Sequence, residues 1–450
     1  MAELHPFRAY RYNRTQVGDL DRLVTQPYDK ISPELQQDYY RRSPYNVARI
    51  TKSLEKTVNP DTDYSEASST MQGWIRDSVL IQDPEPAIYV YYQYYEVEGK
   101  AEVRRGFMAL LDLKHSGSGV LPHERTMAEP KEDRLRLMRA TECNEDLIFM
   151  LYTDDKAAVN GMLDEAASLS HPEIDVSDDF GVKHRVWIVT NPAVIKKIAE
   201  SMVPEELFIA DGHHRFETSV NFMKECEASG FKPAGIESFD KRLVACFNSA
   251  DRGITILPTH RLIRDLPEFN SRNFLGEAKR FFEIESVASS ALLWEKMMAG
   301  WSSSHVFGLY PGDTRSFSLL RLKEEAKVDP FMLSHPEAYR HLDVSILHTL
   351  ILNRLLGIDE GKLVAQAHVD YARDREACIR RVDDERYQAA FFLNPTSVEQ
   401  VQRIAVLGER MPQKSTDFYP KLLTGLVFMK MEIAKTSKPQ PRRYKGTKKH

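Results

Sequence analysis

The chain of 450 residues is longer than one hydrophobic core usually serves, so two or three domains are expected. Its 42% hydrophobic and 28% charged residues are ordinary globular values and exclude a wholly disordered chain. A formal net charge of -5 gives no whole-chain reason to expect a nucleic-acid partner, because that affinity depends on basic patches.

Targeting signals and cysteine clusters are both missing from the sequence. The first residues, MAELHPFRAYRYNRTQ, lack the apolar core of a signal peptide, and no segment approaches about 18 consecutive apolar residues. We therefore expect a cytoplasmic protein without a membrane partner. The four cysteines form no CxxC or Cys/His cluster, so neither a disulfide framework nor a structural zinc is predicted.

The N-terminal part is predicted to hold a loop, a helix and a long hairpin. The stretch TQPYDKIS is typical of a loop, and Ser32 followed by Pro33 marks the start of a helix. Residues 87–113 are tyrosine-rich and β-prone, and Glu98 and Gly99 interrupt them, which predicts a hairpin. We interpret the tyrosines as core and cross-strand residues rather than as a base-stacking platform.

The middle of the chain alternates helical and β-type patterns. A helix at 132–144 is followed by a buried strand at 147–153. Further β-type runs follow at 182–190, 205–210, 241–249 and 253–263. We expect a hairpin that turns between Phe247 and Ile254. The mixture predicts the α+β fold class, with mixed sheets and flanking helices.

The pattern changes after residue 267. The elements predicted there are helices at 273–284, 291–300 and 342–357 and a hairpin at 305–322. We predict an N-terminal α+β domain at 1–266, a second α+β module at 267–432 and a basic flexible tail at 433–450. Residues 267–395 contain no chemical cluster, so a structural or dimerisation role is expected for them.

The stretch 207–218, LFIADGHHRFET, places an acid, a glycine, two histidines and an arginine directly after an apolar strand. Asp211 and Gly212 signal a turn, and the residues after them predict a helix that closes at Gly230. Such a turn exposes backbone N–H groups at the positive end of a helix, so we expect it to bind an anion. Arg215 would add donors suited to phosphate oxygens. On a purely structural interpretation Asp211 would only cap the helix.

Histidines and acids in two stretches could carry acid/base chemistry. His213 and His214 can donate to phosphate or shuttle a proton, and Asp211 can act as a base or hold a metal ion. The stretch LPHERTMAEPKEDR contains His123 and Glu124, but it lacks the second histidine of a HExxH zinc motif. It can still deliver an acid/base residue or a magnesium ligand.

Two further stretches are PTHR at 258–261 and MPQKSTDFYPK at 411–421. Lys414 next to Ser415 and Thr416 could clamp a phosphate. No glycine run precedes it, so the stretch is not a P-loop.

Several of these stretches together resemble the bacterial and archaeal family of domain of unknown function 1015. They are PYDKIS, HERT with DRLRLMRAT, IADGHHRFETS, ILPTHRLI and MPQKSTDFYPKL, in the expected order from about Pro6 to Phe428. The family tends to have two prolines before the tyrosine of the first motif, and Gln26 replaces one of them here.

The five residues from Asp211 to Arg215 also resemble the Asp-Gly-His-His-Arg box of the free-serine kinases, which belong to the ParB/sulfiredoxin-like superfamily. The resemblance implies a ParB/sulfiredoxin-like core that binds nucleotide phosphates at a helix N-terminus. It further implies ATP or ADP with Mg²⁺ as cofactor, and no haem, flavin or structural zinc.

The leading hypothesis is phosphoryl transfer to a small hydroxylated metabolite such as an amino acid, with Asp211 or Glu124 as base. The catalytic candidates are Asp211, Glu124, His123 and His214. The phosphate- or nucleotide-binding candidates are Gly212, His213, Arg215, Thr218, Arg134, Lys414 and Ser415.

Two alternatives stay open at this point. One is a nucleotide-gated binding or regulatory protein without turnover, and the other is a metal-dependent hydrolase that uses His123, Glu124 and the two adjacent histidines. The expected partner is a small phosphate-bearing ligand. We expect nucleic-acid contact only through the basic tail, and a homodimer is left open.

Overall fold

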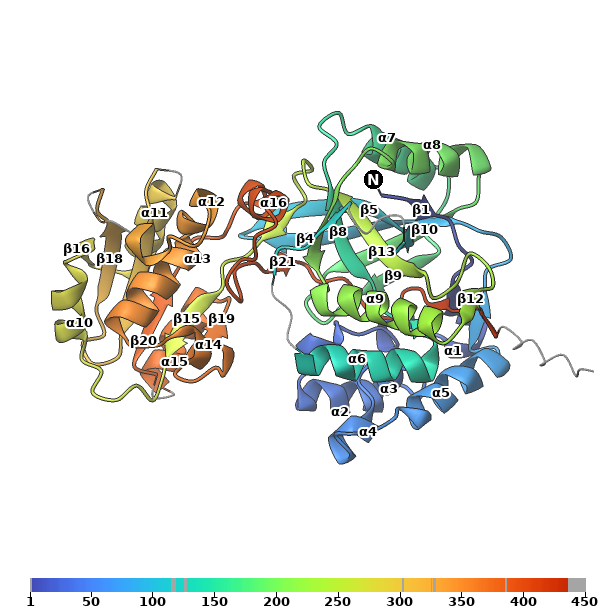
Figure 1. The fold of residues 1–450 in the computed structure, drawn as a ribbon, viewed down its shortest axis with the longest axis horizontal. Helices are drawn as coiled ribbons and strands as arrows, with labels where there is room; N and C mark the ends of the chain where they lie inside the picture. The colour runs from blue at the N-terminus through green and yellow to red at the C-terminus, as the bar shows by residue number, and fades with distance from the viewer. Residues whose placement is uncertain are drawn as a thin grey trace, which may run out of the picture.

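The structure is a computed structural model that describes residues 2–114, 119–124, 128–301, 303–324, 326, 329–384 and 387–435. Helices alternate with strands in several sheets, which confirms the predicted α+β fold class. Figure 1 shows two groups of elements separated along the long axis, one around each of the two largest sheets. No described helix combines the length and the apolar character that a membrane crossing requires.

The first sheet contains nine of the described strands. Its order is β6 (Val120–Leu121), β11 (Leu207–Asp211), β8 (Ile148–Tyr152), β13 (Lys241–Asn248), β5 (Lys100–Asp112), β4 (Ile88–Val97), β10 (Lys183–Val189) and β9 (Ile174–Ser177), and β1 (Leu4–His5) pairs with β5. Strands β4 and β5 form the long hairpin predicted for this part of the chain. Both residues of its turn, Glu98 and Gly99, have positive φ, which matches the twist of paired strands.

Helices cover both faces of the first sheet, as Figure 1 shows. On one face lie α7 (Ala158–Ser168) and α8 (Pro192–Met202). On the other lie α2 (Pro33–Arg42), α3 (Ala48–Thr51), α4 (Leu54–Val58), α5 (Ser65–Arg76), α6 (Ala128–Thr141) and α9 (His213–Ala228). Ser32 caps α2 as predicted, because its side chain accepts from the backbone N–H of Leu35.

The tyrosine-rich strand β4 is buried on both sides. Tyr92 packs in the core cluster that includes α7 and α8, whereas Tyr89 and Tyr91 pack in the cluster on the opposite face. Each phenol has a side-chain partner: Asp83 for Tyr89, His184 for Tyr91 and Asp164 for Tyr92. The tyrosines are therefore core residues, as the sequence predicts.

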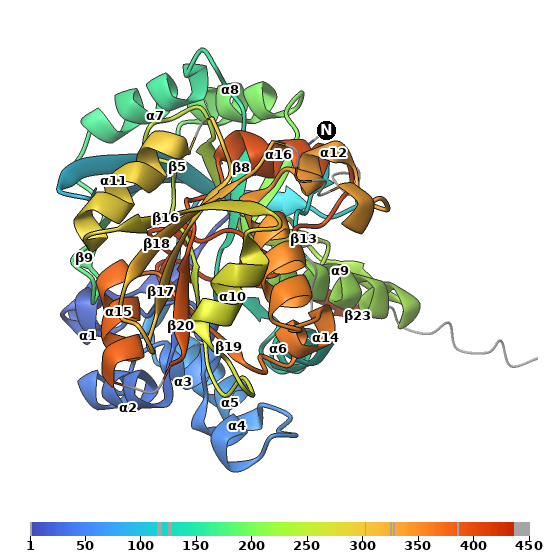
Figure 2. The same cartoon turned by 90° about the vertical axis from the view of Figure 1, so that its left-hand side faces the viewer.

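The second sheet contains six of the described strands, and Figure 2 looks onto this half of the molecule. Its order is β16 (Phe282–Val287), β18 (Phe317–Leu322), β17 (Val306–Pro311), β20 (Ala389–Phe392), β15 (His260–Ile263) and β19 (Val369–Ala372). Its helical segments are α10 (Ser271–Ala278), α11 (Ser290–Gly300), α12 (Glu337–Arg340), α13 (Asp343–Ile346), the π-helix η4 (Leu347–Leu355), α14 (Glu360–Val364) and α15 (Arg375–Asp384). The predicted hairpin at 305–322 is confirmed by the antiparallel pairing of β17 and β18.

The hairpin expected between Phe247 and Ile254 is wrong. Strand β13 pairs with β5 and β8 instead, and β14 (Thr255–Ile256) pairs with β21 (Phe418–Tyr419). The partner of β14 comes from the far end of the chain, so local sequence could not indicate it.

The last described segment returns from the second sheet to the first half of the molecule. After α16 (Val398–Val406), which Ser397 and Gln400 cap, three short strands pair with the N-terminal half. These pairs are β21 with β14, β22 (Met429–Lys430) with β7 (Cys143–Asn144) and β23 (Ile433–Lys435) with β12 (Phe231–Pro233). The domain division expected at residue 267 stays a prediction, and most of the expected basic tail lies outside the described residues.

Candidate functional site

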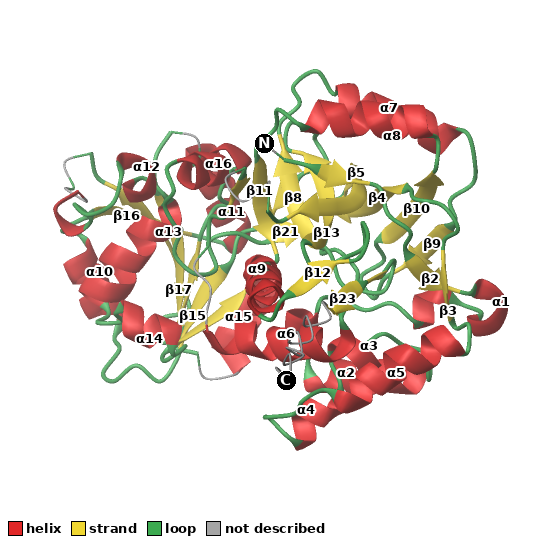
Figure 3. Ribbon diagram, turned by 45° about the vertical axis from the view of Figure 1, so that its right-hand side comes forward, coloured by secondary structure: helices red, strands yellow, loops and turns green. Residues whose placement is uncertain are grey.

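A cavity of about 430 Å³ opens where strand β11 ends and helix α9 begins. Figure 3 shows α9 nearly end-on, near the middle of the molecule. The cavity is lined from the first half by residues 28–30, 124, 130 and 210–215, and from strand β19 and loops of the second half by residues 259, 366 and 371–373. Five positions between Gln413 and Lys421 complete the wall. Its size is typical of a small-molecule site.

The corner between β11 and α9 exposes backbone donors to this cavity. Gly212 is the N-cap of α9 with a φ of 96°, a conformation that side chains other than glycine rarely adopt. An added Cβ would lie only 3.1 Å from Nη2 of Arg215. Gly212 supplies no capping side chain, and the positive end of α9 at this corner would favour an anion.

Asp211 is held between two cations. Its Oδ2 accepts from Nη2 of Arg215 at 2.8 Å, and its Oδ1 accepts from Nζ of Lys421 at 2.8 Å. Burial would raise the pKa of Asp211, but Lys421 and Arg215 outweigh burial and lower that pKa below its ordinary value. Asp211 therefore stays ionised at neutral pH and is a poor proton acceptor.

The guanidinium of Arg215 contacts mainly protein groups. Besides Asp211, its Nη1 donates to the backbone oxygen of Leu147 at 2.7 Å and lies 3.3 Å from Oδ2 of Asp146. Arg215 is 6% exposed. Arg215 lines the cavity, but its guanidinium N–H groups mostly bond Asp211 and the residues just before β8.

His123 and His213 are neutral neighbours, and the backbone N–H of His123 orients the ring of His213. The N–H of His123 donates to Nε2 of His213 at 3.2 Å, which leaves the His213 proton on Nδ1. That Nδ1 lies 3.8 Å from Oε2 of Glu124. Burial lowers the pKa of His123 to about 4 and lowers the pKa of His213 well below its ordinary value. His213 thus faces Glu124 rather than acting as a charged phosphate ligand.

Glu124 is the cavity acid best suited to accept a proton. Its side chain is 31% exposed, yet it opens into a cavity surrounded by protein, and this burial raises its pKa to about 7 against the opposing charge of Lys414. The backbone is anchored beside it, because the N–H of Met411 donates to the oxygen of His123 at 2.8 Å. A carboxyl group with this pKa is poised for acid/base chemistry near neutral pH.

The side-chain ammonium groups of two cavity lysines have no hydrogen-bond or ion-pair partner among the residues the structure describes. These lysines are Lys30, in the 3₁₀ turn η2 (Tyr28–Lys30), and Lys414, whose backbone has a φ of 57°. Burial, and then the positive charge of Lys421, lower the pKa of Lys30. Lysine side chains without a direct ion pair, next to a helix N-terminus, make this end of the cavity attractive to an anion.

The family model described as "Protein of unknown function (DUF1015)" matches residues 4–345. The chain belongs to the DUF1015 family. This confirms the resemblance predicted from the motifs, although the MPQKSTDFYPK stretch lies beyond the matched residues. The comparison with curated proteins found no match.

Solved structures similar to the DUF1015 chain include a free serine kinase in complex with AMP, at 12% identity and a TM-score of 0.35, covering 69% of this chain and 86% of that one. SbnI with C-terminal truncation from Staphylococcus aureus has 11% identity and a TM-score of 0.35, covering 71% and 86%. A conserved hypothetical protein from Pyrococcus furiosus has 11% identity and a TM-score of 0.33, covering 69% and 90%.

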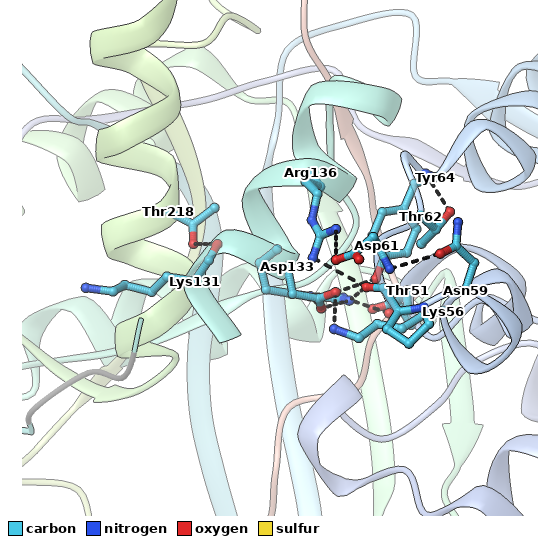
Figure 4. Close-up of polar contacts among 12 residues, drawn as sticks. Thr51, Lys56, Asn59, Asp61, Thr62, Tyr64, Lys131, Asp133, Arg136 and Thr218 are labelled. Atoms are coloured by element: carbon cyan, nitrogen blue, oxygen red, sulfur yellow. Dashed lines mark hydrogen bonds and ion pairs between the residues drawn. The ribbon is translucent and has the colours of Figure 1, made fainter. Parts of the chain in front are cut away.

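Three predicted phosphate ligands of the DUF1015 chain lie outside the cavity lining. The hydroxyl of Thr218 donates to the backbone oxygen of Lys131 on α6, as Figure 4 shows, and that of Ser415 donates to the oxygen of Pro412. Arg134 pairs with Asp133, donates to the oxygen of Thr51 and stacks on the ring of Tyr28. In Figure 4 Asp133 also meets Lys56 and Tyr64, so this cluster joins α6 to the neighbouring helices.

The other predicted residues of the DUF1015 chain line the cavity or lie against it. Asp211, Gly212, His213, His214, Arg215, Glu124 and Lys414 line it. His123 lies behind them, fully buried, with Nε2 at 3.1 Å from Oγ1 of Thr416.

Sequence reasoning missed several lining residues of the DUF1015 site. Lys30 lies in PYDKIS and Lys421 in MPQKSTDFYPK, two stretches that carry the family resemblance. Membership of these motifs was the signal that could have marked both lysines as site residues. Tyr371 and Arg373 come from the region for which a structural or dimerisation role was expected, and no motif marks them. Arg373 pairs with Asp417, which also contacts Lys421.

A metal site needs several His, Cys, Asp or Glu ligand atoms close together, and the described residues can be searched for such groups. Among the residues that the structure describes, only Glu3, His5 and Asp112 bring three ligand atoms within 4.8 Å of one another, and Lys241 already binds Asp112 at 2.9 Å. These residues do not line the cavity. The metal-dependent hydrolase hypothesis, which relies on His123 and Glu124, therefore gains no support from the described geometry.

Proposed function

We propose that this DUF1015 protein binds the phosphate groups of a nucleotide at the N-terminus of α9 and transfers a phosphoryl group to a small hydroxylated acceptor, such as an amino acid. The observation that carries the proposal is the position of Lys30 and Lys414. Both line the same cavity as the first turn of α9, and their side-chain ammonium groups have no partner among the described residues. Phosphoryl transfer depends mostly on positioning and on neutralising the charge of the phosphate oxygens.

Glu124 supplies the second requirement, a proton acceptor for the attacking hydroxyl. Its pKa of about 7 makes it partly ionised at neutral pH, whereas Lys421 and Arg215 keep Asp211 a weak base. Nδ1 of His213 lies 3.8 Å from the carboxylate of Glu124, so the His213 ring faces the proposed base. We therefore assign Glu124 as the base and Asp211 as a fixed negative charge of the site.

A nucleotide would bring Mg²⁺ with it. Proteins commonly hold this ion through one or two carboxylates and through the phosphates of the nucleotide. Asp29 fits this role, because its carboxylate lines the cavity and has no hydrogen-bond or ion-pair partner among the described residues. The bound ion would supply charge neutralisation at the phosphate oxygens. Lys30, next to Asp29 in the chain, would hold the phosphates from the same turn.

Replacing Lys414 by Ala is expected to weaken ATP binding about tenfold or more, because a charge-assisted hydrogen bond to phosphate is lost. Isothermal titration calorimetry with ATP and MgCl₂ would measure the change. The matched control is Lys224→Ala, which removes an exposed lysine further along α9 and should leave the affinity unchanged. Equal affinities for the two variants would contradict the role of Lys414.

Turnover is tested separately by following ADP formation from ATP with a panel of hydroxylated amino acids and other hydroxy metabolites. Acceptor-dependent ADP formation, with a phosphorylated product seen by ³¹P NMR, is the expected result. ATP binding without ADP formation for any acceptor would contradict phosphoryl transfer and favour a nucleotide-gated binding protein.

A further inference from the structure

The cavity lining contains two chemically different sets of residues. The set from η2, Glu124 and the start of α9 carries mainly charged groups. A second set, which comes from later parts of the chain, has neutral polar side chains, and the neighbouring Arg373 is paired with Asp417. These neutral residues are Thr259, Gln366, Tyr371 and Gln413, and we call them the neutral wall.

The side chains of the neutral wall have unused hydrogen-bonding capacity. None of the four has a side-chain hydrogen-bond partner within the part of the chain that the structure describes. The phenol oxygen of Tyr371 is buried and unpartnered. Leaving a buried polar group without a partner costs free energy, so an unpartnered hydroxyl on a residue that lines a cavity calls for an explanation by a ligand or water.

The neutral wall is held in place by a buried cation. The guanidinium of Arg261 lies 5.2 Å from the ring centroid of Tyr371 and donates to the backbone oxygens of Thr259 and Lys414. Its Nη2 also lies 3.1 Å from Nε2 of His348 on the π-helix. Arg261 is fully buried and has no carboxylate partner among the described residues. One side chain thus connects Tyr371 and Thr259 of the neutral wall to the backbone of Lys414.

We infer that the neutral wall recognises the uncharged part of the nucleotide, its ribose hydroxyls and the edge of its base, and so determines which nucleotide is used. This inference rests on the proposed function. A glutamine amide donates and accepts side by side, which is the pattern that the edge of adenine presents. The hydroxyls of Tyr371 and Thr259 can donate to or accept from sugar hydroxyls. The neutral wall therefore contributes specificity, while Lys30, Lys414 and the start of α9 contribute charge.

The test compares ATP with tripolyphosphate, which has the phosphates but no nucleoside. Calorimetry with MgCl₂ should show that the full-length protein binds ATP at least tenfold more tightly than tripolyphosphate. Tyr371→Phe, which removes only the hydroxyl, should weaken ATP binding about three- to tenfold and leave tripolyphosphate affinity within twofold. Gln366→Met should behave in the same way. The control Tyr310→Phe, whose hydroxyl bonds Asp383 in the second sheet away from the cavity, should change neither affinity.

Each outcome decides between the two proposals. Equal affinity of the protein for ATP and tripolyphosphate would overturn the inference and leave phosphate binding intact. Equal weakening of both probes by Tyr371→Phe would also overturn it, because a general structural effect would then explain the loss. Failure of both probes to bind would overturn the proposed function and the inference with it.

Discussion

Replacing Glu124 by Gln should lower the rate of phosphoryl transfer by about 10²- to 10⁴-fold, the range that a positioned general base contributes. Gln has nearly the same size and shape as Glu, so the fold and the affinity for ATP should change little. Steady-state kinetics would show a loss in kcat without a matching rise in KM. A similar loss in ATP affinity would instead indicate a binding role for Glu124.

The pH dependence of the rate gives an independent check of the same residue. Burial raises the pKa of Glu124 to about 7, so the carboxyl group is protonated below that pH and cannot accept a proton. The rate of the natural protein should therefore rise with pH through about 7 and then level off. An ordinary glutamate would be fully ionised well below pH 6. The rise should be absent in Glu124→Gln, and its persistence there would assign the titration to another group.

Arg215→Ala should abolish turnover and lower the free energy of unfolding by about 3–5 kcal/mol, because it breaks a buried ion pair and leaves its partner incompletely compensated. Asp211 would lose its bond to Nη2, and the backbone oxygen of Leu147 would lose its donor. Urea unfolding, monitored by circular dichroism, would measure the change in stability. Activity should be assayed at a temperature where the variant remains folded.

The matched control for Arg215 is an arginine in an exposed ion pair. Arg185 bonds Asp175 at 3.0 Å, with side-chain exposures of 34% and 46%. Because solvent screens such a pair, Arg185→Ala should change the unfolding free energy by only about 0–1 kcal/mol and leave turnover intact. If Arg215→Ala kept the stability and activity of the natural protein, the result would contradict both the role of Arg215 in positioning Asp211 and the proposed phosphate site.

Local signals were enough to predict the corner at 207–218 and the long hairpin. An apolar run, a turn glycine and a helical pattern lie within twelve residues, and each depends on its neighbours alone. The long hairpin is similarly encoded by Glu98 and Gly99. These elements form through contacts close in sequence, so their patterns carry the information.

The partners that complete the site depend on distant contacts. Asp211 and Lys421 are 210 positions apart, and only the return of the C-terminal segment brings them together. Thr218 lies on the corner helix and was expected at the phosphate, but the packing of α6 against α9 directs its hydroxyl to the oxygen of Lys131. The pattern of a single sequence does not specify such packing, so it could not predict that Tyr371 lines the cavity.

The pairing of β14 with β21 also limits how the two halves can move. Ile256, where the chain leaves the first half, pairs with Phe418 of the returning segment in an antiparallel ladder. The return begins earlier in the chain, because Gln402 on α16 bonds Thr153 and Ser249 and the N–H of Met411 donates to the oxygen of His123. Several connections side by side resist twisting and bending of one half against the other. We therefore expect Tyr371 and the start of α9 to keep their relative positions when a ligand enters the cavity.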